Sequence, residues 1–228
     1  MGELRQAAEQ VFGGEVDIQG SGRTDAGVHA SGQVAHLRAP SNRRLIPERI
    51  RSELNEQLPA EIAILAVESA RSDFHARHDA ITRTYVYQIA TQKSAFSKKY
   101  VWWVKDRLDV ATMSRAARML AGRHDFICFR AADPSRPNES TIVVVESASI
   151  EAEEGLIVFR IEASHFIWRM VRRLAGVLVK LGKGEITIDD WQKLLDGRCD
   201  KRLDVAGWTA PSSGLFLEQV KYADRARR

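Results

Sequence analysis

Apolar residues recur along this chain with two different periods, which separate helical segments from β-prone ones. Because these segments interleave without a regular strand–helix alternation, the pattern predicts an α+β fold. From apolar spacing and capping signals, helices are expected over residues 2–12, 47–58, 109–121, 166–181 and 187–197. Strands are expected over residues 16–20, 33–37, 62–68, 84–89, 141–150 and 156–163.

A polar and irregular stretch, residues 69–82, interrupts this pattern near the middle of the chain. Such a stretch is typical of a boundary between two parts of a protein, since few apolar contacts cross it. We therefore expect an N-terminal subdomain over residues 1–75 and a C-terminal subdomain over residues 76–228.

Composition and charge narrow the class of protein only slightly. The net charge of +4 favours an anionic partner weakly. The two cysteines, Cys128 and Cys199, lie far apart and have no second pair beside them, so we expect neither a disulfide framework nor a zinc site. The longest apolar runs, residues 62–67 and 174–181, are too short to cross a bilayer. These features predict a cytoplasmic protein without contact to a membrane.

A glycine-dense loop, residues 20–32, is the most informative segment. It has neither the Gly-Lys-Ser/Thr ending of a phosphate-binding loop nor the third glycine of a dinucleotide fingerprint. It presents Asp25 two positions after Arg23, and its glycines permit close approach of a bulky ligand. A carboxylate in such a setting can attack an electrophilic carbon. The alternative interpretation is that Asp25 only caps a turn.

The stretch Gly-Arg-Thr-Asp-Ala-Gly-Val-His-Ala, residues 22–30, resembles the signature of the tRNA pseudouridine synthase A family. The resemblance continues in order along nearly the whole chain. Later motifs are Phe-His-Ala-Arg (residues 74–77), Arg-Thr-Tyr-Val-Tyr (83–87), Asp-Phe (125–126), Met-Val-Arg-Arg-Leu (170–174) and Gly-Leu-Phe-Leu (214–217).

The resemblance implies a reaction and a site. It implies isomerisation of uridine to pseudouridine at nucleotides 38–40 of the tRNA anticodon stem-loop, by a homodimer that uses neither a metal nor another cofactor. Asp25 would be the nucleophile and Arg172 its cationic partner. Arg23 would enter the RNA to displace the target base, and Tyr85 would lie against that base. The implied fold has two similar subdomains, each an antiparallel sheet backed by helices, with the active-site cleft between them.

The helix expected over residues 166–181 has an apolar stripe and a basic face. No acidic residue lies between Glu162 and Glu185, so a face with only one sign of charge is expected, which suits the RNA backbone. A solvated helix face is the alternative. The expected RNA contacts are Arg77, Arg169, Arg173, Lys180 and Lys183.

Two rival functions remain open from the sequence. The family normally begins with a strand and a Gly-Trp-Gln segment, whereas this chain begins at the first helix, and Ser140 stands where an arginine is expected. The chain could therefore be a catalytically impaired RNA-binding remnant of the family. A metal-dependent nuclease that uses Asp25, His29 and His36 is the second rival, although a second carboxylate close in sequence is missing.

Overall fold

The computed structural model describes residues 2–39, 45–132 and 138–223, and it confirms a mixed α+β fold. The chain forms two compact units. The first comprises Met1–Arg23, Gln33–Ile81 and Val220–Arg228, and the second comprises Thr24–Gly32 and Thr82–Gln219. These units differ from the expected continuous subdomains, residues 1–75 and 76–228. Two short segments, Thr24–Gly32 and the one that begins at Val220, belong to the unit with which they form hydrogen bonds. Residues 29–30 pair with a strand of the second unit, and the Tyr222 hydroxyl donates to the Ala76 carbonyl of the first, at 2.7 Å.

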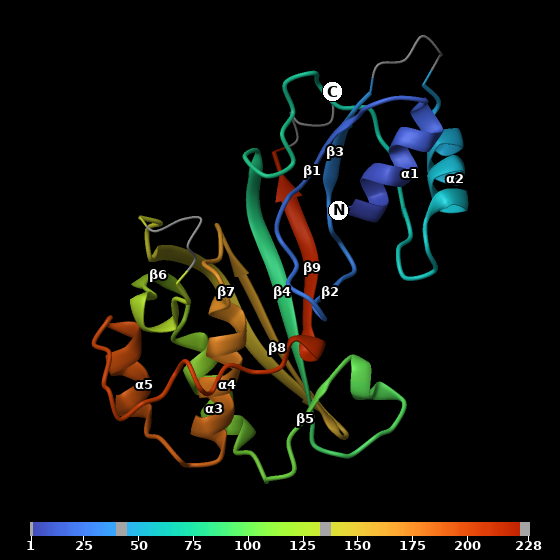
Figure 1. Ribbon diagram of the computed structural model, residues 1–228. Helices are drawn as coiled ribbons and strands as arrows, with labels where there is room; N and C mark the ends of the chain where they lie inside the picture. Colours follow the sequence, from blue (N-terminus) through green and yellow to red (C-terminus); the bar gives the residue numbers. More distant parts are fainter. Residues whose placement is uncertain (1, 40–44, 133–137, 224–228) are drawn as a thin grey trace. The chain divides into compact units, whose positions relative to one another are not determined.

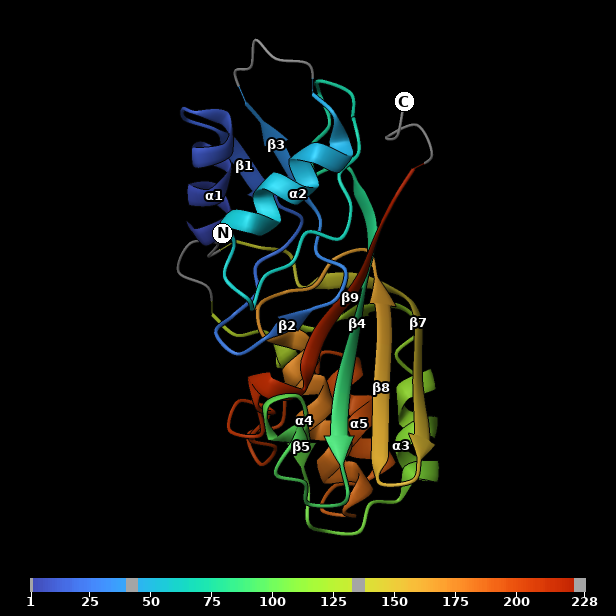
Figure 2. The same cartoon turned by 90° about the vertical axis from the view of Figure 1, so that its right-hand side faces the viewer.

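The first unit is a small layer of two helices on two strands (Figures 1 and 2). Helices α1 (Gly2–Phe12) and α2 (Pro47–Gln57) pack against β1 (Asp17–Gly20) and β3 (Ala35–Arg38), which pair antiparallel. Pro47 opens α2, where a missing backbone N–H costs nothing. The core between the layers consists of Ala7, Ala8, Val16, Ile18, Ile50 and Leu54.

The strand expected over residues 62–68 is wrong, because no strand forms there. Instead, the Asn55 side chain on α2 forms hydrogen bonds with the backbone of this segment. Its amide donates to the Ile64 carbonyl at 3.0 Å, and its oxygen accepts the Ile64 N–H at 2.7 Å. A helix side chain thus satisfies backbone groups that a neighbouring strand would otherwise bond.

A seven-stranded sheet forms the body of the second unit. Its order is β2-β9-β4-β8-β7-β6, with β5 beside β4. The β4–β8, β8–β7 and β7–β6 pairs are antiparallel as expected, while β2–β9 and β5–β4 are short parallel pairs. The strands are β2 (His29–Ala30), β4 (Ala80–Ala90), β5 (Trp102–Trp103), β6 (Gly122–Asp125), β7 (Ile142–Glu153), β8 (Leu156–Ala163) and β9 (Leu215–Tyr222).

Three helices cover one face of this sheet: α3 (Val110–Arg118), α4 (Met170–Gly182) and α5 (Ile188–Leu195) (Figures 1 and 2). The Thr187 and Asp190 side chains form the expected capping box at the start of α5. Helix α4 begins at Met170 and not at residue 166 as expected. The expected apolar stripe is buried in the core of this unit; it comprises Ile167, which precedes α4, and Met170, Val171, Leu174, Val177, Leu178 and Leu181. Short 3-10 turns are η1 (Ser97–Lys99), η2 (Ile127–Phe129) and η3 (Ser212–Gly214). Within the described residues, no helix has both the length and the hydrophobicity needed to cross a bilayer.

Candidate active site

The loop that carries Asp25 is fixed at its C-terminal end by the sheet. A tight turn follows Asp25, in which the Val28 N–H donates to the Asp25 carbonyl at 3.0 Å. Gly27 has a φ of +78°, a backbone conformation that favours glycine, and a Cβ there would also displace the Ser212 Oγ, which would lie 2.7 Å away. Immediately afterwards β2 pairs with β9. The backbone around Asp25 is therefore held by the second unit.

Two side chains approach the Asp25 carboxylate, one from the segment just before α4 and one from α4 itself. The Trp168 indole Nε1 donates to Asp25 Oδ1 at 3.3 Å. An Arg172 guanidinium nitrogen, Nη1, lies 3.7 Å from the other oxygen, Oδ2. The Arg172 side chain is 16% exposed and the Asp25 side chain 36%, so the carboxylate stays accessible while its cationic partner is mostly covered.

Arg172 is anchored by the chain segment that runs from Trp208 to Pro211. Its Nε donates to the Ala210 carbonyl at 2.7 Å, and the Ala210 N–H donates back to the Arg172 carbonyl at 3.1 Å. Helix α4 approaches this segment so closely that a Cβ on Gly176 would lie 1.8 Å from the Trp208 carbonyl oxygen. Burial, and next the positive charge of Arg169, lower the pKa of Arg172, whereas Asp25 opposes that change. Arginine still remains charged in a protein.

Tyr85 belongs to the same cluster. It lies in the middle of β4 opposite Ile161, and its ring packs edge-on against Phe166 at a centroid distance of 4.9 Å. Burial raises the pKa of Tyr85, and the negative charge of Asp25 raises it further. The structure therefore brings Arg172 beside Asp25 and places Tyr85 within the range of the Asp25 charge.

Two predicted residues lie outside this cluster's unit. Arg23 is exposed and Arg77 is half-buried, and both belong to the first unit. Their expected contacts with RNA stay predictions.

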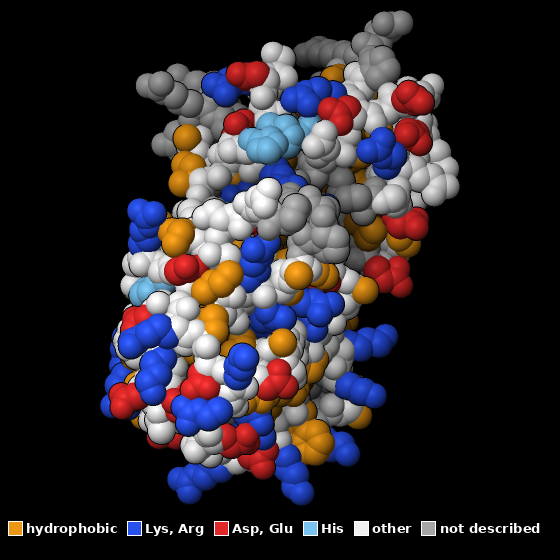
Figure 3. Space-filling view, turned by 60° about the vertical axis from the view of Figure 1, so that its left-hand side comes forward, with side chains coloured by type: hydrophobic (Ala, Val, Ile, Leu, Met, Phe, Trp, Pro, Cys, Tyr) orange, Lys and Arg blue, Asp and Glu red, His pale blue; other side chains and the backbone are white. Residues whose placement is uncertain are grey.

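The expected basic face itself contains no acidic residue, but carboxylates from outside it lie beside its two lysines. Asp106 forms an ion pair with Lys183, and Glu185 lies 2.5 Å from the Lys180 ammonium. The Lys183 ammonium also lowers the pKa of Asp106. Arg173 donates to the Arg130 carbonyl. On the face shown in Figure 3, Lys and Arg side chains are interspersed with Asp and Glu. Lys180, Lys183 and Arg173 thus have partners within the chain, and RNA contact by them stays a prediction.

The histidines of the rival nuclease are engaged elsewhere. His29 has its Nε2 2.8 Å from the Lys99 carbonyl, and its ring stacks on Phe216. The His36 Nδ1 accepts the Ala76 N–H at 3.1 Å. In the part of the chain that the structure describes, no group of three or more His, Cys, Asp or Glu residues could hold a metal ion.

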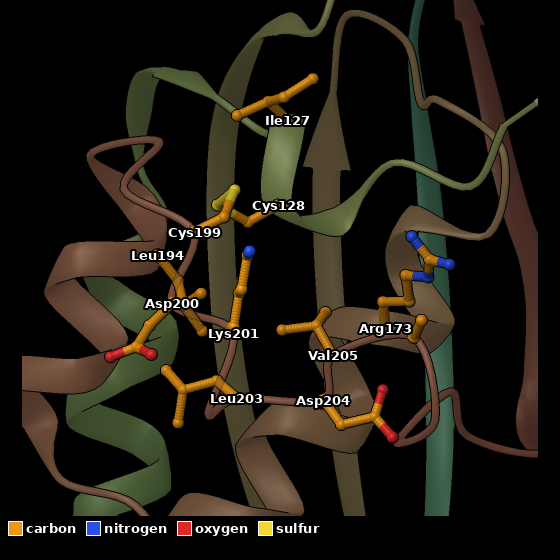
Figure 4. A pocket seen from close by; sticks show the side chains of 11 residues that line it. Ile127, Cys128, Arg173, Leu194, Cys199, Asp200, Lys201, Leu203, Asp204 and Val205 are labelled. Atoms are coloured by element: carbon orange, nitrogen blue, oxygen red, sulfur yellow. A yellow bond between two sulfur atoms is a disulfide. The ribbon is translucent and has the colours of Figure 1, made fainter.

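The sequence predicted no disulfide framework, but the two cysteines are joined. Cys128 in η2 and Cys199 after α5 form a disulfide, with their Cα atoms 5.3 Å apart. The bond borders an open cavity of about 370 Å³, into which Lys201 points (Figure 4). Neither Asp25 nor Tyr85 lines this cavity. The cysteines therefore no longer support the expectation of a reducing compartment.

Two parts of the site were missed by sequence reasoning. Ala210 acts only through its backbone, which leaves no signal in residue type. Trp168 does carry a signal in the sequence, because a tryptophan just before the basic motif supplies an N–H donor, and in the structure this N–H donates to Asp25.

Comparison with known proteins first defines the class. A family model described as tRNA pseudouridine synthase matches residues 2–79 and 116–223. Proteins named tRNA pseudouridine synthase A are similar over most of the chain. That of Fervidobacterium nodosum is 38% identical over 97% of this chain and 89% of its own length, and that of Thermosipho melanesiensis is 37% identical over 97% and 88%. The protein of Geobacillus kaustophilus is 37% identical over 98% and 85%. The chain belongs to the tRNA pseudouridine synthase A family.

Proposed function

We propose that this chain isomerises uridine to pseudouridine in tRNA and that Asp25 is its nucleophile. The observation that carries the proposal is the arrangement around Asp25. Its carboxylate is accessible, an N–H donor contacts one of its oxygens, and a guanidinium group lies beside the other. Both donors come from the turn and helix that carry the family's third motif, and Tyr85 of the second motif lies within the range of the carboxylate's charge.

The reaction is an intramolecular transfer. The bond from ribose C1′ to uracil N1 breaks, the ring turns, and C1′ joins C5. The proton at C5 leaves to solvent and N1 takes up a proton, so no redox partner is consumed. The carboxylate can trap the ribose at C1′ or add to the pyrimidine ring. The positive charge of Arg172 stabilises the carboxylate in the free enzyme and when it leaves again.

The target base must leave its helical stack before Asp25 can reach it. Flipping costs a few kcal/mol, and stacking on an aromatic ring recovers about 1–3 kcal/mol. Tyr85 is suited to this role, because Phe166 supports its ring from the side. Arg23 would fill the space that the base leaves. The basic residues Arg77, Arg169, Arg173, Lys180 and Lys183 would contact the RNA backbone, with smaller contributions from the two lysines because each has a carboxylate partner.

The finer features of the proposal come from the family resemblance. They are the target nucleotides 38–40 of the anticodon stem-loop, a homodimeric assembly and a cytoplasmic location. Sedimentation equilibrium of the purified chain, with and without tRNA, tests the assembly.

The function is tested with unmodified tRNA transcripts. Carbodiimide labelling, read by primer extension, marks pseudouridine at single-nucleotide resolution. We expect new stops at uridines among nucleotides 38–40 and none in transcripts where these positions are cytidine. Binding without any modification would support the RNA-binding remnant instead, and stops only at other positions would refute the proposed target.

A further inference from the structure

The two oxygens of the Asp25 carboxylate are engaged by different chemical groups. Oδ2 faces the charged guanidinium of Arg172 at 3.7 Å, which is an ion-pair distance but too long for a hydrogen bond. Oδ1 accepts a hydrogen bond from the neutral indole N–H of Trp168 at 3.3 Å. Arg172 therefore supplies charge, whereas Trp168 supplies direction, because an N–H donor of a rigid ring fixes where its acceptor points.

The backbone around Trp168 is held in one conformation. Its carbonyl accepts the Ala131 N–H at 3.2 Å. The next residue, Arg169, has a φ of +61° and is the one non-glycine residue with a positive φ among those described. L-residues adopt such a conformation rarely, and it persists only where the surroundings enforce it. Here α4 begins directly afterwards, and the Arg173 N–H donates to the Arg169 carbonyl at 3.0 Å.

The turn at Arg169 also places its guanidinium over the indole. The Arg169 Cζ lies 4.7 Å from the centre of the Trp168 ring, a cation–π distance. The ring is thus held by a cation on its face and by the Asp25 carboxylate at its N–H edge. A tryptophan that only filled space would need neither contact.

We propose that Trp168 is a positioning residue that aims the Asp25 carboxylate at the substrate through its indole N–H. The inference rests on the proposed role of Asp25 as nucleophile. With Oδ1 tied to the indole, rotation of the carboxylate about its Cβ–Cγ bond is restricted, and Oδ2 is left beside Arg172 as the attacking oxygen. Effective catalysis depends on such alignment of the reacting atoms.

The test is Trp168→Phe, which keeps an aromatic ring for Arg169 but removes the N–H. Loss of a hydrogen bond to a charged group predicts a kcat about 10- to 100-fold lower, with the KM for tRNA within about threefold of the unchanged enzyme. The matched control is Trp103→Phe. Trp103 is also exposed to solvent, and the centre of its ring lies 5.3 Å from the Lys93 ammonium. It belongs to β5 and not to the site. This control is expected to leave kcat and KM unchanged.

A second replacement removes the N–H with almost no change of shape. Incorporation of β-(3-benzothienyl)alanine at position 168 substitutes sulfur for the N–H, so it remains informative if Trp168→Phe is unstable. An unchanged kcat, or a loss that falls entirely on KM, would overturn the inference. Asp25→Asn, measured in parallel, separates the two proposals. If Asp25→Asn is inactive while both Trp168 replacements turn over normally, only the positioning role fails; if Asp25→Asn turns over, the nucleophile fails.

Discussion

At the scale of single residues, the site depends on groups that are far apart in the sequence and have complementary tasks. The Asp25 side chain is accessible and the Arg172 side chain is mostly covered. Tyr85, which comes between them in the sequence, lies in β4. Burial raises the pKa of Tyr85, so its phenol stays neutral across the physiological range, and its proposed task is to offer a ring to the displaced base.

Replacement of Tyr85 tests that task. Tyr85→Ala is expected to lower kcat/KM roughly 5- to 150-fold, which corresponds to the loss of about 1–3 kcal/mol of stacking. Tyr85→Phe keeps the ring and is expected to bind tRNA as tightly as the unchanged chain. Steady-state kinetics with a tRNA transcript measure both variants, with thermal unfolding as the control for folding. Equal losses of tRNA affinity in the two variants would argue against stacking.

The residue types at the site could be predicted from the sequence, but their surroundings could not. The motifs predicted Asp25 and Arg172, which the structure places side by side, and Tyr85, which lies within the range of the Asp25 charge. The partners that hold them depend on tertiary contacts. The contact of Arg172 with the Ala210 carbonyl leaves no signal in the sequence, whereas Trp168 does carry one, although its hydrogen bond to Asp25 depends on the fold.

At the scale of elements, local signals predicted the helices better than the strands. Capping groups such as Thr187 with Asp190 act within one turn, so they can be read from the sequence. A strand instead needs a neighbouring strand that bonds its backbone. In the β-prone segment 62–68, the Asn55 side chain forms hydrogen bonds with the Ile64 backbone instead. Pairings between distant segments were also missed for this reason. Examples are the Lys183–Asp106 ion pair and the Cys128–Cys199 disulfide.

Gly176 connects the packing of α4 with the site. A side chain there would meet the Trp208 carbonyl at 1.8 Å and push away the segment that anchors Arg172. Gly176→Ala is therefore expected to lower the free energy of unfolding by about 1–3 kcal/mol and to reduce kcat as well. Chemical denaturation and tRNA kinetics measure the two effects. The matched control is Gly14→Ala, where a Cβ meets nothing within 4 Å and a change below about 0.5 kcal/mol is expected. Equal stability of the two variants would contradict the close packing.

At the scale of the whole molecule, the chain combines a small unit that carries Arg23 and Arg77 with a larger one that carries the Asp25 cluster. Family membership extends over both, since the family model matches from residue 2 to residue 223 with one interval. The two units differ in stability determinants: the larger has the extended sheet and the disulfide, whereas the smaller has a core of few residues and a buried histidine.

The buried His36 makes the stability of the chain depend on pH. Burial, and next the positive charge of Arg38, lower the pKa of His36 below its ordinary value of 6.5. Its neutral Nδ1 also accepts the Ala76 N–H. Below pH 6.5 the unfolded chain therefore binds this proton more readily than the folded one, so stability is fully present above that pH and falls as the pH decreases.

Urea denaturation between pH 7.5 and pH 5, a range of a few units around the ordinary histidine pKa, measures this effect. His36→Asn keeps a hydrogen-bond acceptor near the position of Nδ1 without the titration, and it is expected to show a flatter dependence over the same range. Identical pH profiles for the two proteins would contradict a depressed pKa of His36.

The most direct test of the whole account is the turnover of Asp25→Asn on tRNA labelled with tritium at uracil C5. Formation of the new C1′–C5 bond releases this tritium to water, so its release counts isomerisation events. The account predicts no release above background from Asp25→Asn, while its affinity for tRNA stays close to that of the unchanged chain. Tritium release by this variant at a rate near that of the unchanged chain would contradict the central claim.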